Sequence, residues 1–277
     1  PKTLTASVSP VLLGCALAYC DGMFRPVVAV LCLLVALLAQ IASNFANDYF
    51  DFKQGADTQE RIGPERAVAS GRIRPPAMLR ATFLTLGLAC LCGLGVVYLA
   101  GWWLLLVGIA IALCVLAYSA GPYPLAYHGL GDVCVLLFYG VIPVCFTYYV
   151  QAFSFSLLYF WLSLAVGLLS VNILIVNNYR DYEQDKAAGK RTSIVLFGRP
   201  FGRRLYLANG ILALLFTLPL LLETGLSWAF WLFVFFFGLH LHSWSALGIL
   251  QGRALNVILG RTARNVFLYT LLLIFSL

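Results

Sequence analysis

Apolar residues fill long runs of this chain, and short charged segments separate the runs. A helix needs about 20 mainly apolar residues to cross a hydrocarbon core of about 30 Å. Nine runs approach this length, at residues 6–21, 27–50, 78–99, 102–120, 132–151, 156–179, 205–223, 227–249 and 263–277. Lipid cannot satisfy free backbone groups, and no ten-residue alternation indicates a barrel. The pattern therefore predicts an all-α integral membrane protein with nine transmembrane helices, folded as one domain over residues 1–277.

Charge supports this topology and orients it. Charged residues make up 10% of the chain, against roughly 25% in soluble domains. With nine spans, every Lys and Arg except Arg25 falls on one side of the membrane, and the positive-inside rule makes that side cytoplasmic. The net charge of +7 then follows from topology, and we expect no nucleic-acid partner. We expect the inner or plasma membrane of a bacterium.

Two features carry little chemistry. The eight cysteines lie in or beside apolar runs without a CxxC pair, which is typical of packing residues. His240 and His242 are two residues apart and would point to different faces of a helix, which disfavours a metal pair.

The first ten residues lack an initiator Met and a signal-peptide pattern, so we expect a trimmed N-terminus.

Two acidic segments end apolar runs and match each other. "NDYFD" at 47–51 and "NNYRD" at 177–181 share Asn, Tyr and Asp at the same offsets, and a basic, Gly-containing loop follows each. Four spans separate them, so both face the same side. We expect an internal pseudo-repeat, roughly 1–130 and 131–277.

The spacing of these acids predicts a metal site. On continuous helices two sets of side chains would each share one face: Asn44, Asn47 and Asp51, and Asn177, Asp181 and Asp185. If the faces meet at a cavity, their carboxylates lie within a few ångströms of each other. The repulsion between two such charges 6 Å apart is about 3 kcal/mol at an effective dielectric constant near 20, so the site needs cations. Oxygen ligands alone favour a hard cation, magnesium before zinc, while the choice between magnesium and manganese stays open.

Bases surround the predicted metal site. Lys190 and Arg191 follow Asp185, Arg180 precedes Asp181, and Arg66 lies in the first loop. Acids that hold a metal beside bases that hold an anion indicate a diphosphate site. The alternative is that acids and bases only pair with each other at a wet helix end.

Three strings resemble a known family. "NDYFDFKQGADTQERIGPERAVASG", "HGLGDVCVLLFYG" and "NNYRDYEQDKAAGKRT" are similar to sequences of the UbiA superfamily of intramembrane prenyltransferases, in the branch that acts on 1,4-dihydroxy-2-naphthoate. The resemblance implies nine helices around a central cavity capped by cytoplasmic loops. It implies magnesium-dependent transfer of a polyprenyl group from its diphosphate to the naphthoate, with loss of carbon dioxide, in menaquinone biosynthesis. The implied partners are these two substrates and membrane lipid, with no obligatory protein partner.

The resemblance also implies roles for individual residues. Metal and diphosphate would be held by Asn47, Asp48, Asp51, Asp181 and Asp185, and the catalytic set would be Asp51, Asp181, Asp185 and Lys190. The substrates would contact Asn47, Arg66, Asn177, Asn178, Arg180 and Arg191. Three tyrosines between the fourth and fifth runs, Tyr118, Tyr123 and Tyr127, are candidates to face the allylic cation through cation–π contact. The usual first motif has an Asp four residues after its second Asp, where this chain has Gly55, and Asp57 comes two residues later.

Two alternatives remain open at this stage. Another aromatic acceptor, such as 4-hydroxybenzoate, would keep the acids and change the pocket. A cation transporter also uses intramembrane acids and repeats, although its acids would be expected near the midplane rather than at span ends.

Overall fold

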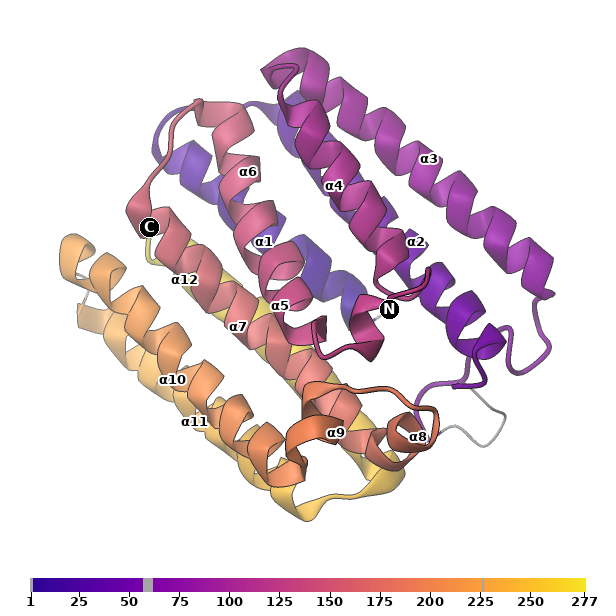
Figure 1. Cartoon of the computed structure of the whole chain (residues 1–277). Helices are drawn as coiled ribbons and strands as arrows, with labels where there is room; N and C mark the ends of the chain where they lie inside the picture. The colour runs from indigo at the N-terminus through magenta and orange to yellow at the C-terminus, as the bar shows by residue number, and fades with distance from the viewer. Residues whose placement is uncertain (1, 57–61, 226) are drawn as a thin grey trace.

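The computed structural model is built from helices, and it describes residues 2–56, 62–225 and 227–277. No strand occurs in those ranges. The elements in chain order are α1 (Lys2–Cys20), α2 (Pro26–Lys53), α3 (Pro75–Ala100), α4 (Leu104–Ala117), the 3₁₀ turn η1 (Leu125–Tyr127), α5 (Gly131–Leu136), the π-helical turn η2 (Leu137–Val141), α6 (Ile142–Ala152), α7 (Leu157–Arg180), α8 (Tyr182–Ala187), α9 (Ser193–Phe197), α10 (Arg199–Thr224), α11 (Ser227–Ile249), η3 (Gly252–Ala254) and α12 (Leu255–Phe275) (Figure 1).

The helices confirm an all-α membrane protein. In the described ranges, seven helical segments are long and apolar enough to cross a membrane: 26–53, 75–100, 131–152, 157–180, 199–224, 228–249 and 252–275. The other two predicted spans form the shorter apolar helices Leu4–Cys20 and Leu104–Ala117. At about 1.5 Å per residue these two are shorter than the hydrocarbon core, so the count of nine spans stays a prediction.

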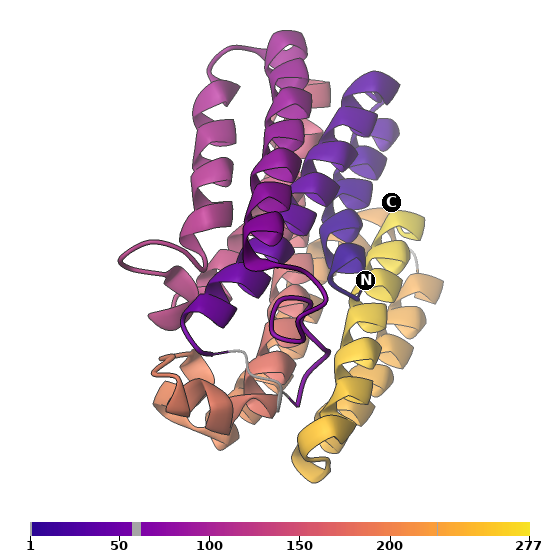
Figure 2. The ribbon, with the colours of Figure 1, turned by 90° about the vertical axis from the view of Figure 1, so that its right-hand side faces the viewer.

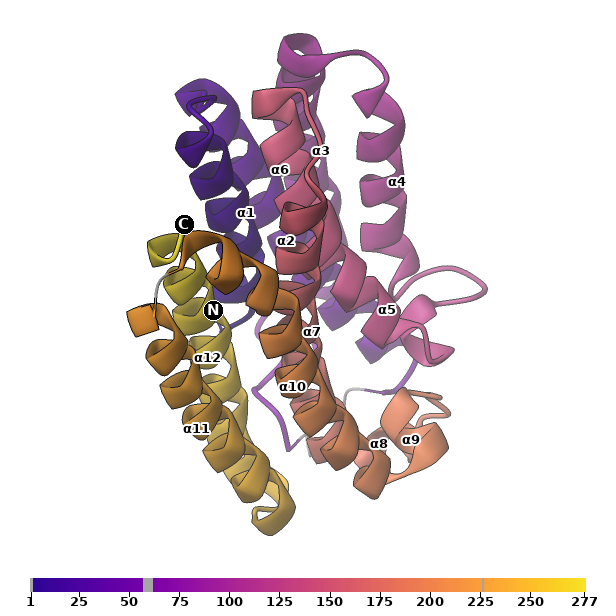
Figure 3. The ribbon, with the colours of Figure 1, turned by 90° about the vertical axis from the view of Figure 1, so that its left-hand side faces the viewer.

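Helix α7 lies at the centre of the bundle. Helices α10, α11 and α12 lie on one flank, while α3 and α4 lie on the opposite flank (Figures 1 and 3). Of the 24 residues of α7, 14 are buried. The loop after α2 and the α8–α9 segment lie toward the same end of the molecule (Figure 2).

Proline sets two features of the fold. Pro26, Pro75 and Pro200 stand in the first turns of α2, α3 and α10, where a missing N–H is harmless. Pro143 instead follows the π-helical turn, and its missing N–H cannot bond the Tyr139 carbonyl in the α-helical pattern. The Ser170 hydroxyl of α7 donates to the Val166 carbonyl at 2.9 Å and lies 3.5 Å from the Tyr139 carbonyl, so the turn packs against α7.

One local prediction is wrong. The face shared by Asn177, Asp181 and Asp185 assumed one continuous helix, but α7 ends at Arg180 and α8 begins at Tyr182. Asp181 joins the two with φ −90° and ψ 10°. The chain therefore bends where its charged residues begin, at the end of the apolar run.

Candidate active site

A cavity of about 1190 Å³ lies between α2, α3, α4, the α5–α6 segment and α7. Its walls carry Leu, Val, Ile, Ala and Phe side chains over most of their length. The acidic ends of α2 and α7 line the same cavity, although they come from distant parts of the sequence. The predicted meeting of the two acidic segments is therefore confirmed as a shared cavity wall.

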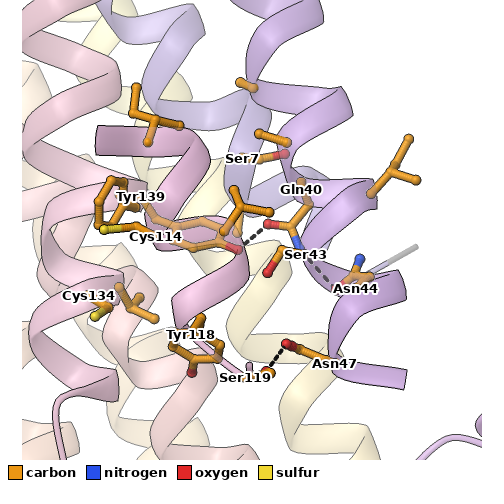
Figure 4. A pocket seen from close by; sticks show the side chains of 18 of the residues that line it. Ser7, Gln40, Ser43, Asn44, Asn47, Cys114, Tyr118, Ser119, Cys134 and Tyr139 are labelled. Atoms are coloured by element: carbon orange, nitrogen blue, oxygen red, sulfur yellow. Dashed lines mark hydrogen bonds between the residues drawn. The ribbon is translucent and has the colours of Figure 1, made fainter. Parts of the chain in front are cut away.

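The end of α2 contributes three polar side chains. Asn47 accepts a short hydrogen bond from the Ser119 hydroxyl (Figure 4). Asp48 is buried, and its two carboxylate oxygens accept hydrogen bonds from the backbone N–H groups of Ala67, at 2.9 Å, and Val68, at 3.1 Å. Asp48 thus holds the loop that follows α2 in place. The sequence analysis predicted a metal-binding role for Asp48 and did not predict this contact with the loop.

The anchored loop brings Arg66 to the cavity. Pro64, Glu65, Arg66 and Ala67 all contribute to the wall. Because Asp48 holds the two residues that follow Arg66, the position of this guanidinium depends on α2. The sequence placed Arg66 near the substrates, and the structure places it at the cavity.

The end of α7 is built around a buried arginine. Arg180 donates to both carboxylate oxygens of Asp181, with Nε–Oδ1 at 2.7 Å and Nη2–Oδ2 at 2.6 Å. It also donates to the side-chain oxygens of Asn177 and Asn256, each at 2.8 Å. The Arg180 side chain is 0% exposed and does not belong to the described cavity wall. It orients Asp181 from behind, and its predicted direct contact with substrate stays a prediction.

Lys190 joins the two acidic segments. Its ammonium lies 3.2 Å from Asp51 Oδ1 and 4.0 Å from Asp185 Oδ1, and 4.7 Å from the centroid of the Tyr127 ring. The Tyr127 hydroxyl donates to Asp51 Oδ1 at 2.9 Å. Burial, reinforced by the Asp51 charge, raises the pKa of Tyr127, so this tyrosine remains a donor at neutral pH.

The oxygen atoms of this site fit a hard cation chemically. Asp51, Asp181, Asp185 and Asn47 all line the cavity and offer only oxygen ligands. In the described ranges, however, no three or more Asp, Glu, His or Cys side chains are grouped so that they could hold a metal ion. The expectation of tightly clustered carboxylates is therefore not met, because each acid is paired with a base, Lys190 or Arg180.

Other predicted residues fall into two groups. Asn177 and Asn178 line the cavity. Tyr123 and Arg191 do not: Tyr123 is 57% exposed and stacks on His128 with ring centroids 3.5 Å apart, while Arg191 is exposed and its backbone N–H donates to the Tyr127 carbonyl. Neither residue lines the described cavity, and their substrate contacts stay predictions. Asp57 lies outside the described residues.

The cavity also contains polar side chains that the sequence analysis did not select. The Tyr139 hydroxyl donates to Gln40 Oε1, and Gln40 Nε2 donates to Asn44 Oδ1 at 3.0 Å (Figure 4). Tyr118, one of the tyrosines expected to face the cation, points into the same space. Polar residues inside apolar runs were the available signal, but a single sequence does not show which of them face inward.

Comparisons with known proteins agree with the architecture. The model of the UbiA prenyltransferase family matches residues 7–275. A protein named 1,4-dihydroxy-2-naphthoate octaprenyltransferase from Escherichia coli is 39% identical over 74% of this chain and 68% of its own length. Its namesake from Haemophilus influenzae is 37% identical over 84% and 79%.

Solved structures show the same fold at low identity. A UbiA homolog from Aeropyrum pernix superimposes with a TM-score of 0.69 at 15% identity, over 99% of this chain and 94% of that one. A homolog from Archaeoglobus fulgidus, bound to DMAPP and Mg²⁺, gives 0.59 at 17% identity, over 99% and 83%.

Proposed function

The chain belongs to the UbiA prenyltransferase family, and we propose that it transfers a polyprenyl group from polyprenyl diphosphate to 1,4-dihydroxy-2-naphthoate. The products are demethylmenaquinone in its reduced form, diphosphate and carbon dioxide. The observation that carries this function is the similarity, over most of the chain, to relatives named for this reaction. The cavity, with one charged end and long apolar walls, suits a substrate with a diphosphate head and a hydrocarbon tail.

The charged end supports a role in diphosphate departure. Loss of diphosphate from the allylic carbon places negative charge on the leaving oxygen, and fixed positive charge stabilises it. Lys190 is the base that lies between Asp51 and Asp185 at this end. Magnesium held by Asp51, Asp181, Asp185 and Asn47 would supply further positive charge to the diphosphate oxygens. Arg180 then acts as a positioning residue, because it fixes the Asp181 carboxylate.

The apolar walls support the second step. An allylic cation reacts with water, so it survives only where water is excluded. A ring carbon of the naphthoate attacks the cation and forms a carbon–carbon bond at the position that bears the carboxylate. The resulting β-keto acid breaks its bond to the carboxyl group, and the electron pair of that bond returns to the ring. Arg66, which the Asp48 contact holds at the cavity, is our choice to bind the acceptor carboxylate.

The distribution of basic residues supports an orientation of the protein in the membrane. It is a multi-pass membrane protein. We propose that the loops that carry Arg66 and Lys190 face the cytoplasm of a bacterium, because seventeen of the eighteen bases would then lie on that side, as the positive-inside rule requires.

A product assay tests the function. Purified protein in lipid, given the naphthoate, a long prenyl diphosphate and magnesium, should form demethylmenaquinol and one equivalent of carbon dioxide. Asp51→Asn should lower turnover about a hundredfold or more, the scale of losing one main electrostatic contact at a reacting centre. Glu183→Gln is the matched control, because Glu183 lies on α8 beside Asp185 but its side chain is 70% exposed. Prenylation of 4-hydroxybenzoate without turnover of the naphthoate would overturn the proposed acceptor.

A further inference from the structure

Two buried polar groups on the cavity wall have no role in the steps above. Asp132 stands in the first turn of α5, and Ser193 is the first residue of α9. Both line the cavity. In the described part of the chain, neither Asp132 Oδ1 nor Ser193 Oγ has a hydrogen-bond partner, although both atoms are buried.

Such atoms are rare in folded proteins. Most buried polar groups have a partner, and one that lacks it destabilises the fold unless water or a ligand completes it. Asp132 and Ser193 are about 60 residues apart in sequence, yet both face this cavity. The Ser193 hydroxyl lies close to the Asp132 carboxyl without reaching hydrogen-bond geometry. Two unsatisfied groups that face one cavity from different elements indicate a shared ligand.

The chemistry of the pair selects the kind of ligand. An ionised carboxylate only accepts hydrogen bonds, while a serine hydroxyl donates and accepts. A ligand hydroxyl placed between them would donate to Asp132 and accept from Ser193. Neither the diphosphate nor the hydrocarbon tail carries a proton to donate, and a carboxylate repels the diphosphate. Among the proposed substrates, only the aromatic acceptor carries such a hydroxyl.

The backbone next to Asp132 is closely packed. Gly131 precedes Asp132, and a Cβ at this position would lie 3.1 Å from Leu174 Cδ2 and 3.5 Å from Tyr118 Oη. Glycine at this position lets α5 approach Leu174 and the Tyr118 hydroxyl closely. On the same cavity wall, Lys190 and Arg66 supply the positive charge for anions.

We propose that Asp132 and Ser193 form an acceptor subsite that binds the ring hydroxyl adjacent to the carboxylate, an inference that rests on the proposed function. As the ring carbon attacks the allylic carbon, the carbon–oxygen bond of this hydroxyl gains double-bond character and its proton becomes more acidic. Asp132 holds that proton. When carbon dioxide leaves, the electron pair of the broken bond returns to the ring and the hydroxyl is restored. No external base or oxidant takes part, and diphosphate leaves with the electron pair of its own bond.

A pair of inhibitors tests the subsite without turnover. Binding of 1-hydroxy-2-naphthoate and of 1-methoxy-2-naphthoate is measured on purified protein, because methylation removes the donated proton and keeps the carboxylate. We expect the wild type to prefer the hydroxy compound by about tenfold or more, the scale of one hydrogen bond to a charged group. In Asp132→Asn, which keeps the shape and removes the charge, the preference should fall to about threefold or less.

Controls separate this role from a structural one. Ser193→Ala should reduce the preference less than Asp132→Asn does, and Glu183→Gln should leave it unchanged. The KM for prenyl diphosphate should stay within about threefold in all three variants, since their interactions with the donor are unaltered. If Asp132→Asn does not fold, a reduced preference in Ser193→Ala supports the subsite and an unchanged preference overturns it.

Two results would overturn the proposal: an equal preference in wild type and Asp132→Asn, or no preference in the wild type. Failure of the proposed function gives a different result. A chain that does not prenylate the naphthoate but still distinguishes the two inhibitors through Asp132 would refute the reaction and support the subsite.

Discussion

Asp48→Asn separates an anchoring role from a metal-binding role for this residue. Asp48 belongs to the acidic motif of α2, which predicted a metal ligand, yet its two oxygens accept hydrogen bonds from the backbone N–H groups of Ala67 and Val68. Asparagine retains one carbonyl oxygen and replaces the other with an NH₂ group, which cannot accept. One of the two contacts is therefore lost, and the remaining one no longer involves a charge.

The size of the effect follows from these two contacts. A hydrogen bond to a charged acceptor contributes about 1.5–3 kcal/mol, which corresponds to about 10- to 150-fold in an equilibrium constant. Other contacts of the loop are weaker substitutes: Asn256 donates to the Ile62 carbonyl at 3.2 Å, and the Arg72–Glu65 ion pair is exposed and contributes little. The ordered loop that carries Arg66 should lose most of this stabilisation.

The assay measures each substrate and the metal separately. We expect Asp48→Asn to raise the KM for the naphthoate about tenfold or more, because Arg66 is no longer held in place. The magnesium concentration for half-maximal activity should stay within about threefold of the wild type, since the anchoring role makes no use of the ion. Proteolysis in the loop after α2 should become faster. Asp51→Asn is the control and should raise the magnesium requirement. A raised magnesium requirement in Asp48→Asn, with an unchanged KM for the naphthoate, would refute the anchoring role.

Three further substitutions test the site and the fold. Lys190→Ala should raise the KM for prenyl diphosphate about tenfold and affect the acceptor less, because an ammonium is a point charge suited to phosphate; a change confined to the acceptor would contradict this. Arg180→Lys keeps the charge but loses the bidentate contact with Asp181, so kcat should fall about tenfold or more. The midpoint of thermal unfolding, measured in detergent, should show that this variant remains folded. Gly140→Ala should lower the thermal midpoint by several degrees, because the new Cβ would lie 2.7 Å from a backbone carbonyl of α7. Gly108→Ala is the control and should leave the midpoint unchanged, because its Cβ meets open space. Equal midpoints in the two variants would refute the close packing at Gly140.

Hydrophobic runs predicted the helices well because lipid leaves the backbone few alternatives. The charged ends of the second and sixth runs also predicted that the two acidic segments would meet, and both line one cavity. These properties belong to single segments and their order, which a sequence displays directly. The internal repeat and the individual roles of the acids stay predictions.

Side-chain direction was the part that the sequence could not supply. Arg180 and Arg191 look equivalent as bases next to acidic motifs, yet one is enclosed behind Asp181 and the other is exposed. The bend at Asp181 interrupts the straight helix that the spacing assumed, although Asn177, Asp181 and Asp185 still line one cavity. Asp132 lies inside an apolar run, and its lack of a partner becomes visible only when the surrounding helices are placed.

The ion pair between Lys190 and Asp51 also has a consequence for the order in which the protein is made. The two residues are about 140 positions apart, so at about 5–20 residues per second Lys190 leaves the ribosome on the order of ten seconds after Asp51. During that interval the Asp51 carboxylate has no counter-ion from the later half of the chain. Its place at the end of α2, within reach of water at the membrane surface, lets the nascent helix insert before its partner has been synthesised.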